Sequence, residues 1–182
     1  LFNSEYFLLK KKINLGLDLQ GGSYLLLEID NSPVIEQKLQ NLKISLRNYF
    51  KEKKIRLNNL KISNQSLSFT VSQEFKEIVL NEFNDEESNI NPYYQRFKMH
   101  QYDVTEKDNQ LVLKFSRQGL VELKTSSQDQ ALEIVRRRID EIGTNEPNIL
   151  KRGNDRILVE LPGLDDPMRI KSLLGKTANL TF

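Results

Sequence analysis

A short leucine-rich stretch that ends in two adjacent glycines restricts the fold of this chain more than any other part of its sequence. Over residues 15–20 leucine occupies every odd position and polar or small residues occupy the even ones, a period of two that predicts a β-strand. The alternation stops at Gly21-Gly22, where the backbone can adopt a positive φ or let another segment approach closely. A second strand is predicted over residues 22–30, and its leucine run predicts burial on both faces.

The composition narrows the class of protein to which the chain can belong. Its 27 basic and 25 acidic residues give a formal net charge of only +2, which argues against a nucleic-acid-binding protein. Cysteine is absent, so disulfides, thiolate metal sites and cysteine nucleophiles are excluded. The sequence contains no run of about 18 apolar residues, so it predicts no membrane-spanning segment. Because the sequence lacks an initiator methionine, we expect it to be a piece of a larger protein.

Apolar periodicity divides the chain into two successive sets of elements. Ser32 is a favourable helix N-cap, and Pro33 with an apolar stripe at helical spacing follows it. The first set is a strand over residues 22–30, a helix from 32 to about 51, strands over 60–64 and 67–72, a helix over 73–84 and a strand over 96–103. The second set is a strand over 111–115, a helix over 117–142, a hairpin of strands over 149–152 and 156–161, a helix from Asp166 to Gly175 and a strand over 178–182.

Each set has the order β-α-β-β-α-β, which is the order of the ferredoxin-like fold. The predicted fold class is therefore α+β, with two successive ferredoxin-like units built on antiparallel or mixed sheets. The expected domains are an N-terminal segment over residues 1–14, a first unit over 15–106 and a second unit over 107–182.

The glycine pair is not explained by phosphate binding. The stretch lacks the Lys-Ser/Thr ending of a P-loop and the glycine spacing of a dinucleotide-binding turn. A strand end with a tight turn accounts for Gly21 and Gly22, but it leaves Asp18 and Gln20 without a role. We therefore hypothesise that Asp18 and Gln20 fix this region against a neighbouring membrane segment or a second domain.

No group of side chains predicts catalysis. His100 is the only histidine, so neither a histidine metal site nor a histidine dyad is available. The basic run Arg136-Arg137-Arg138 is spaced to pair with acidic residues one helical turn away, which predicts a neutralised helix surface. Most aromatic residues are expected in the core, although Tyr93 and its neighbour Tyr94 could form an apolar contact surface. The sequence thus predicts no enzyme, no metal and no cofactor.

Two separated motifs resemble the SecD family of bacterial protein-export proteins. The first is Leu15-Gly16-Leu17-Asp18-Leu19-Gln20-Gly21-Gly22, and the second runs from Arg137 to Gly163 and is followed by a similar ending over residues 174–182. The family-motif residues that we expect to make contacts between domains or near the membrane are Gly16, Asp18, Gln20, Gly21 and Gly22. The residues of the second motif, expected to be mainly structural, are Arg137, Gly143, Glu146, Pro147, Arg156, Glu160, Pro162 and Gly163.

The resemblance implies a fragment of the first periplasmic domain of a SecD protein. Its N-terminal segment would be membrane-proximal, and its second unit would be truncated at the C-terminal end relative to the family. Family members are multi-pass proteins of the bacterial inner membrane, so the implied location is its periplasmic side, without the flanking membrane helices. The implied partners are SecF, the SecYEG channel and unfolded preprotein, and the implied role is to assist translocation driven by the proton-motive force.

Two other classes fit parts of the sequence. A porter-like subdomain of another transporter of the resistance-nodulation-division type would share the same kind of units. A ferredoxin-fold module that binds a small ligand or RNA is disfavoured by the balanced charge and by the lack of a strand combining basic and aromatic residues.

Overall fold

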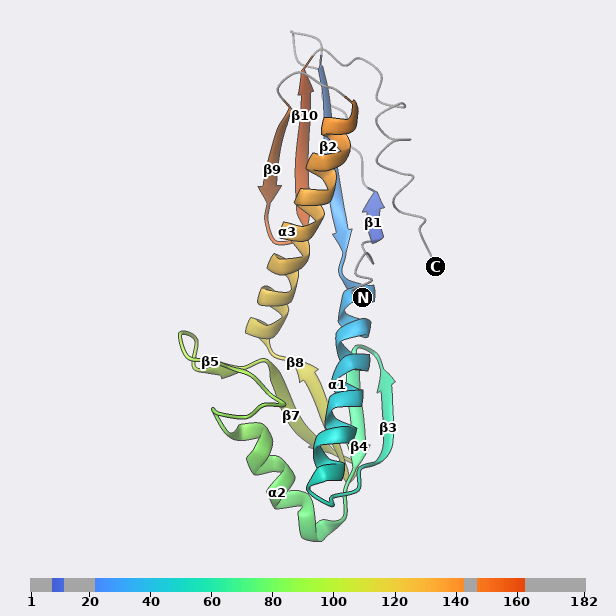
Figure 1. Ribbon diagram of the computed structural model, residues 1–182, viewed down its shortest axis with the longest axis vertical. Helices are drawn as coiled ribbons and strands as arrows, with labels where there is room; N and C mark the ends of the chain where they lie inside the picture. Colours follow the sequence, from blue (N-terminus) through green and yellow to red (C-terminus); the bar gives the residue numbers. More distant parts are fainter. Residues whose placement is uncertain (1–7, 12–21, 143–146, 163–182) are drawn as a thin grey trace. The chain divides into compact units, whose positions relative to one another are not determined.

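The structure, a computed structural model, describes residues 8–11, 22–142 and 147–162 (Figure 1). Its helices are α1 (Ser32–Glu52), α2 (Gln73–Asn84) and α3 (Arg117–Ile142). Its strands are β1 (Leu8–Lys11), β2 (Gly22–Asp30), β3 (Asn58–Ser63), β4 (Ser66–Thr70), β5 (Tyr93–Tyr94), β6 (Met99–His100), β7 (Tyr102–Lys107), β8 (Gln110–Phe115), β9 (Asn148–Arg152) and β10 (Arg156–Pro162). These elements confirm an α+β fold in which every strand pairing is antiparallel.

The chain divides into two compact units. Unit 1 combines residues 1–34 with residues 124–182, and unit 2 consists of residues 35–123. The chain therefore enters unit 2 within α1 and returns to unit 1 within α3. One unit is inserted into the sequence of the other, rather than following it.

Unit 1 contains a sheet of four strands in the order β1-β2-β10-β9. In its central pair, Gly22 lies opposite Pro162 and the register continues to Glu28 opposite Arg156. Packing of α3 against this sheet produces a continuous apolar core formed by Leu25, Leu27, Ile29, Ala131, Val135, Ile139, Ile157, Val159 and Leu161. The helix supplies residues at spacings of four, and the strands supply every second residue, as their periodicities require.

The burial of β2 corrects one prediction. Leu25, Leu27 and Ile29 are buried, whereas Leu26 and Glu28 between them are only half-buried. The strand is therefore not buried on both faces. A leucine run cannot distinguish a strand buried on both faces from one whose second face is partly covered, because leucine tolerates both environments.

Unit 2 contains a sheet in the order β3-β4-β8-β7, together with the two-stranded hairpin of β5 and β6. The predicted stripe of α1 is confirmed, since Ile35, Leu39, Leu42, Leu46 and Phe50 are all buried. In the aromatic part of the core, the ring of Phe83 from α2 lies 6.2 Å from that of Phe50 and 6.2 Å from that of Phe69 in β4. These contacts fasten both helices to the sheet.

The C-terminus of α1 is closed by a Schellman motif. The N–H of Ile55 donates to the carbonyl of Phe50 over 2.8 Å, and the N–H of Lys54 donates to the carbonyl of Lys51 over 3.0 Å. Lys54 adopts the left-handed conformation that this motif requires, with a φ of 60°. The motif turns the chain sharply, so that residues 56–59 line the same pocket as the last turns of the helix.

The boundaries of most elements agree with the sequence prediction, and the helix over residues 117–142 is confirmed. The structure does not confirm two successive ferredoxin-like units. β2, which was expected to begin the first unit, pairs with β10 near the end of the described chain. β8, which was expected to begin the second unit, pairs with β4. The expected boundary between residues 106 and 107 falls inside β7.

The single strand predicted over residues 96–103 is replaced by parts of two strands, β6 and β7. β6 folds back on β5, Lys98 takes a φ of 49° in the turn between them, and β7 begins only at Tyr102. Three predicted elements lie outside the described residues: the strand over 15–20, the helix from Asp166 to Gly175 and the strand over 178–182. Among the helices that the structure describes, none has the length and apolar character needed to cross a membrane.

Candidate functional site

The structure brings the two predicted motifs together at the central strand pair of unit 1. Gly22, the last residue of the first motif, lies opposite Pro162 of the second. Glu160 lies opposite Tyr24 in the same pair, and its carboxylate accepts a hydrogen bond of 2.8 Å from the side-chain amide of Asn148 in β9. The motifs are thus neighbours in one sheet although most of the chain separates them.

Two other residues of the second motif are exposed. Arg156 lies opposite Glu28, and its guanidinium is 3.9 Å from the carboxylate of Asp155. Arg137 lies on the exposed surface of α3, where Glu133 pairs with Arg136 instead, over 2.7 Å. Pro147 is half-buried directly before β9. The remaining predicted residues, Gly16, Asp18, Gln20, Gly21, Gly143, Glu146 and Gly163, lie outside the described part of the chain.

Gln128, which the sequence did not identify as a contact residue, connects α3 to the hairpin of β9 and β10. Gln128 is only 3% exposed, and its amide nitrogen donates to the carbonyls of Gly153 over 3.0 Å and Arg156 over 2.8 Å. A buried glutamine in an otherwise amphipathic helix gives no periodic signal, because it lies on the same stripe as the apolar residues.

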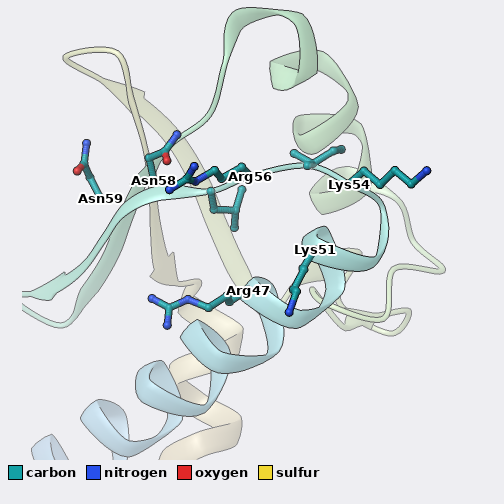
Figure 2. A pocket seen from close by; sticks show the side chains of 8 residues that line it. Arg47, Lys51, Lys54, Arg56, Asn58 and Asn59 are labelled. Atoms are coloured by element: carbon teal, nitrogen blue, oxygen red, sulfur yellow. The ribbon is translucent and has the colours of Figure 1, made fainter.

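A basic pocket of about 600 Å³ lies at the C-terminal end of α1 in unit 2. Its lining residues are Arg47, Lys51, Lys54, Ile55, Arg56, Leu57, Asn58 and Asn59. Figure 2 shows that Arg47 extends from α1 and Arg56 from the following segment toward the same open side, whereas Lys54 extends in the opposite direction. The pocket contains four cationic side chains and no acidic one.

The pocket belongs to a wider concentration of positive charge. Residues 36–61 contain eight lysines and arginines against two glutamates, although the whole chain carries a net charge of only +2. Residues 74–87, which include most of α2, contain six acidic residues and one lysine. A charge count over windows of the sequence could have revealed this asymmetry, which the total charge conceals.

An ionic network beside the pocket connects α1 with α2. The carboxylate of Glu82 accepts hydrogen bonds from the hydroxyl of Tyr49 and, over 2.5 Å, from the ammonium of Lys53. That ammonium also lies 4.6 Å from the centre of the Tyr49 ring. Partial burial raises the pKa of Glu82, but the hydrogen bonds from Lys53 and Tyr49 lower it by more, so it lies below the ordinary value of 4.5.

This shift predicts a pH-dependent effect of Glu82→Gln. A carboxylate whose pKa is lower in the folded state stabilises the fold above its ordinary pKa and loses that contribution as the pH falls. We expect the variant to have a lower urea midpoint than the parent at about pH 7, and the difference to shrink as the pH falls below the ordinary carboxyl pKa of 4.5. Glu77→Gln, which changes an exposed glutamate of the same helix, is the control and should leave the midpoint unchanged at both pH values. An equal loss at both pH values would contradict the ionic role.

His100 packs against the segment that leads into the hairpin of β5 and β6. Its Nδ1 lies 3.0 Å from the backbone carbonyl of Asn91, and its ring lies 4.7 Å from that of Tyr93. Tyr93 and Tyr94 are half-buried in the hairpin of β5 and β6, whose turn exposes 43% of Phe97. Within the part of the chain that the structure describes, no three histidine or acidic side chains are grouped as metal ligands.

Two family models match the chain at the segments that form unit 1. Residues 6–33 match the SecD/SecF GG motif, and residues 128–182 match the N-terminal part of the P1 domain of protein translocase subunit SecDF. Neither model extends over residues 35–123, which form unit 2. Both matched segments therefore lie almost entirely in unit 1.

Longer relatives extend the similarity through unit 2. The chain is 38% identical over 175 residues, or 93% of its length, to protein translocase subunit SecD of Rickettsia bellii. It is 35% identical over 97% of its length to SecD of Rickettsia felis, and 35% identical over 94% to SecD of Acetobacter pasteurianus. These matches confirm the resemblance: the chain belongs to the SecD family. It spans about a third of the length of these relatives, 31–32%, and no solved structure matches it.

Proposed function

We propose that this chain is a non-catalytic periplasmic domain of the SecD subunit of the Sec translocon. In this role it assists preprotein translocation driven by the proton-motive force, through conformational change and direct handling of preprotein. Its partners are SecF, the SecYEG channel and the unfolded preprotein. It works at the periplasmic side of the inner membrane, in a full-length protein that supplies the membrane helices.

The observation that best supports this proposal is the structure of unit 1. The strand that begins with the last glycine of the GG motif pairs along its length with β10, from the P1-domain match. Two family segments that are distant in sequence thus build one sheet and one core. In the mechanism that we propose, the domain adopts more than one conformation and each conformation offers different contacts to an unfolded chain.

The first motif has a separate role in this proposal. Asp18 and Gln20 would contact a neighbouring membrane segment or domain of the full-length protein, and the glycines Gly16, Gly21 and Gly22 would permit close approach of the backbone. The residues of the second motif, from Arg137 to Gly163, would stabilise the sheet of unit 1 and so support the contact of the first motif with its neighbour.

The proposal predicts that the purified chain binds unfolded polypeptide and does not bind RNA. The test is a titration with a fluorescently labelled, permanently unfolded preprotein segment of mixed composition, with a single-stranded RNA as the control. We expect saturable binding of the polypeptide alone. If neither ligand binds, this chain does not handle preprotein, and if only RNA binds, the assignment to protein export is wrong.

A further inference from the structure

The four cations of the basic pocket are not neutralised within the described part of the chain. Arg47, Lys51, Lys54 and Arg56 form no ion pair with any residue that the structure describes. Other lysines of unit 2 do have acidic partners, such as Lys53 with Glu82. All four cationic side chains of the pocket are exposed, so its positive charge faces solvent.

The position of the pocket explains only part of this charge. Lys51 and Lys54 lie at the C-terminal end of α1, where cations are favoured by the partial negative charge of the helix end. Arg47 is a full turn earlier, and Arg56 follows the helix, so the helix end does not account for either. Their guanidinium groups extend toward the same open side (Figure 2). Guanidinium groups bind carboxylates through two parallel hydrogen bonds, so this pair is suited to hold an anionic ligand.

The surroundings of the arginines favour an extended polypeptide over other anions. A volume of about 600 Å³ is in the range of pockets that hold a ligand much larger than one phosphate. Apolar side chains accompany the cations: Leu57, which is half-buried, lines the pocket, and Ile44, one turn before Arg47 on α1, is 60% exposed. No aromatic side chain lines the pocket, although stacking on such residues is the usual means of holding single-stranded nucleic acid.

We propose that this pocket binds acidic segments of an extended polypeptide, with Arg47 and Arg56 clamping the carboxylates. The proposal deepens the proposed function, on which it relies for the source of the polypeptide. Asn58, at the start of the edge strand β3, lies beside Arg56 and adds a side-chain amide to the pocket. Charged contacts of this kind weaken as salt is added, because ions screen exposed charges.

The test compares three versions of the chain by fluorescence anisotropy. These are the parent, the pocket variant Arg47→Gln with Arg56→Gln, and a control variant Lys107→Gln with Lys114→Gln. The control removes the same number of charges from exposed positions of unit 2 outside the pocket. Each is titrated with a labelled unstructured peptide that combines glutamates with apolar residues, and with its counterpart in which glutamine replaces every glutamate.

We expect the Kd for the acidic peptide to rise about tenfold in the pocket variant and less than about twofold in the control. The glutamine peptide should bind weakly to all three proteins. Because all four substituted side chains are exposed, we expect the urea midpoints of the three proteins to agree, which keeps the comparison free of folding effects.

Three results would overturn this inference. They are an equal Kd for the acidic peptide in the parent and the pocket variant, equal binding of the two peptides, or arginine-dependent binding only to single-stranded RNA or to phosphatidylglycerol vesicles. The preprotein segment of mixed composition separates this inference from the proposed function. If that segment binds parent and pocket variant equally and the acidic peptide also has an equal Kd for both, polypeptide handling stands and the pocket assignment falls. If it does not bind while the acidic peptide binds through the arginines, the pocket stands and the proposed function falls.

Discussion

Replacing Gly119 with alanine is expected to lower the free energy of unfolding by about 2–4 kcal/mol. An added Cβ at this position would lie 2.2 Å from the carbonyl oxygen of Gln101 and 3.1 Å from its carbonyl carbon. These are backbone atoms, and the same oxygen accepts a hydrogen bond of 2.9 Å from the N–H of Ser116. The clash therefore cannot be relieved by rotation of a side chain. The first turn of α3 or the connection before β7 has to move.

The surrounding hydrogen bonds make this movement costly. The hydroxyl of Ser116, the residue before α3, donates to the carbonyl of His100 over 2.6 Å and accepts from the N–H of Gly119 over 3.0 Å. Urea denaturation followed by circular dichroism measures the loss. Arg117→Ala, at an exposed position of the same turn, is the control and should change the free energy of unfolding by less than about 0.5 kcal/mol. An alanine variant at Gly119 as stable as the parent would show that α3 does not approach Gln101 so closely.

A loss of about 3–5 kcal/mol is expected for Asn91→Ala. The side chain of Asn91 is 1% exposed and makes three hydrogen bonds to backbone groups. Its amide nitrogen donates to the carbonyls of Phe83, over 2.8 Å, and Tyr102, over 3.0 Å, and its oxygen accepts from the N–H of Tyr102 over 2.9 Å. Alanine leaves all three backbone groups without these partners in a buried environment, and each such group costs about 1–3 kcal/mol.

Asn91→Asp tests the same contacts by their chemistry. A carboxylate can still accept from the N–H of Tyr102, but it cannot donate, and its charge faces the carbonyls of Phe83 and Tyr102. The folded state therefore raises the pKa of the introduced carboxyl group. The loss in free energy of unfolding caused by Asn91→Asp should be larger at about pH 7 than at about pH 4. Asn81→Ala, which changes an exposed asparagine of α2, should have little effect at either pH. A pH-independent loss in Asn91→Asp would mean that the asparagine acts by packing alone.

These two positions belong to one buried junction of unit 2. Burial raises the pKa of Tyr102 to about 12, with a further contribution from Tyr94, so its hydroxyl stays protonated at neutral pH. That hydroxyl accepts a hydrogen bond of 3.2 Å from the side chain of Gln101. Asn91, Gln101, Ser116 and Gly119 are separated in sequence and carry no periodic pattern. The sequence therefore predicted neither the junction nor the close approach that requires a glycine.

The candidate sites were predicted unequally. The residues of the two family motifs could be identified from the sequence because they are contiguous runs, and the comparisons confirm the family. The basic pocket could not, because Arg47 belongs to a helix and Arg56 to the segment after it. Only the reversal of the chain at Lys54 and Ile55 brings the two guanidinium groups to one side.

The sequence by itself determined where most helices and strands lie and, with the exception of β2, which face of each main element is buried. These features depend on spacings of two, three and four residues, and such spacings can be read within a single element. It also determined the family, because the motifs are local. Only the tertiary structure decided that β2 pairs with β10 and not with the strands that follow it, which inserts unit 2 into unit 1. The physical reason is that alternation specifies which face of a strand is buried, while the backbone groups that pair strands are the same in every residue except proline. The choice of partner therefore follows from the shared core of Leu25, Val135 and Val159, not from any one segment.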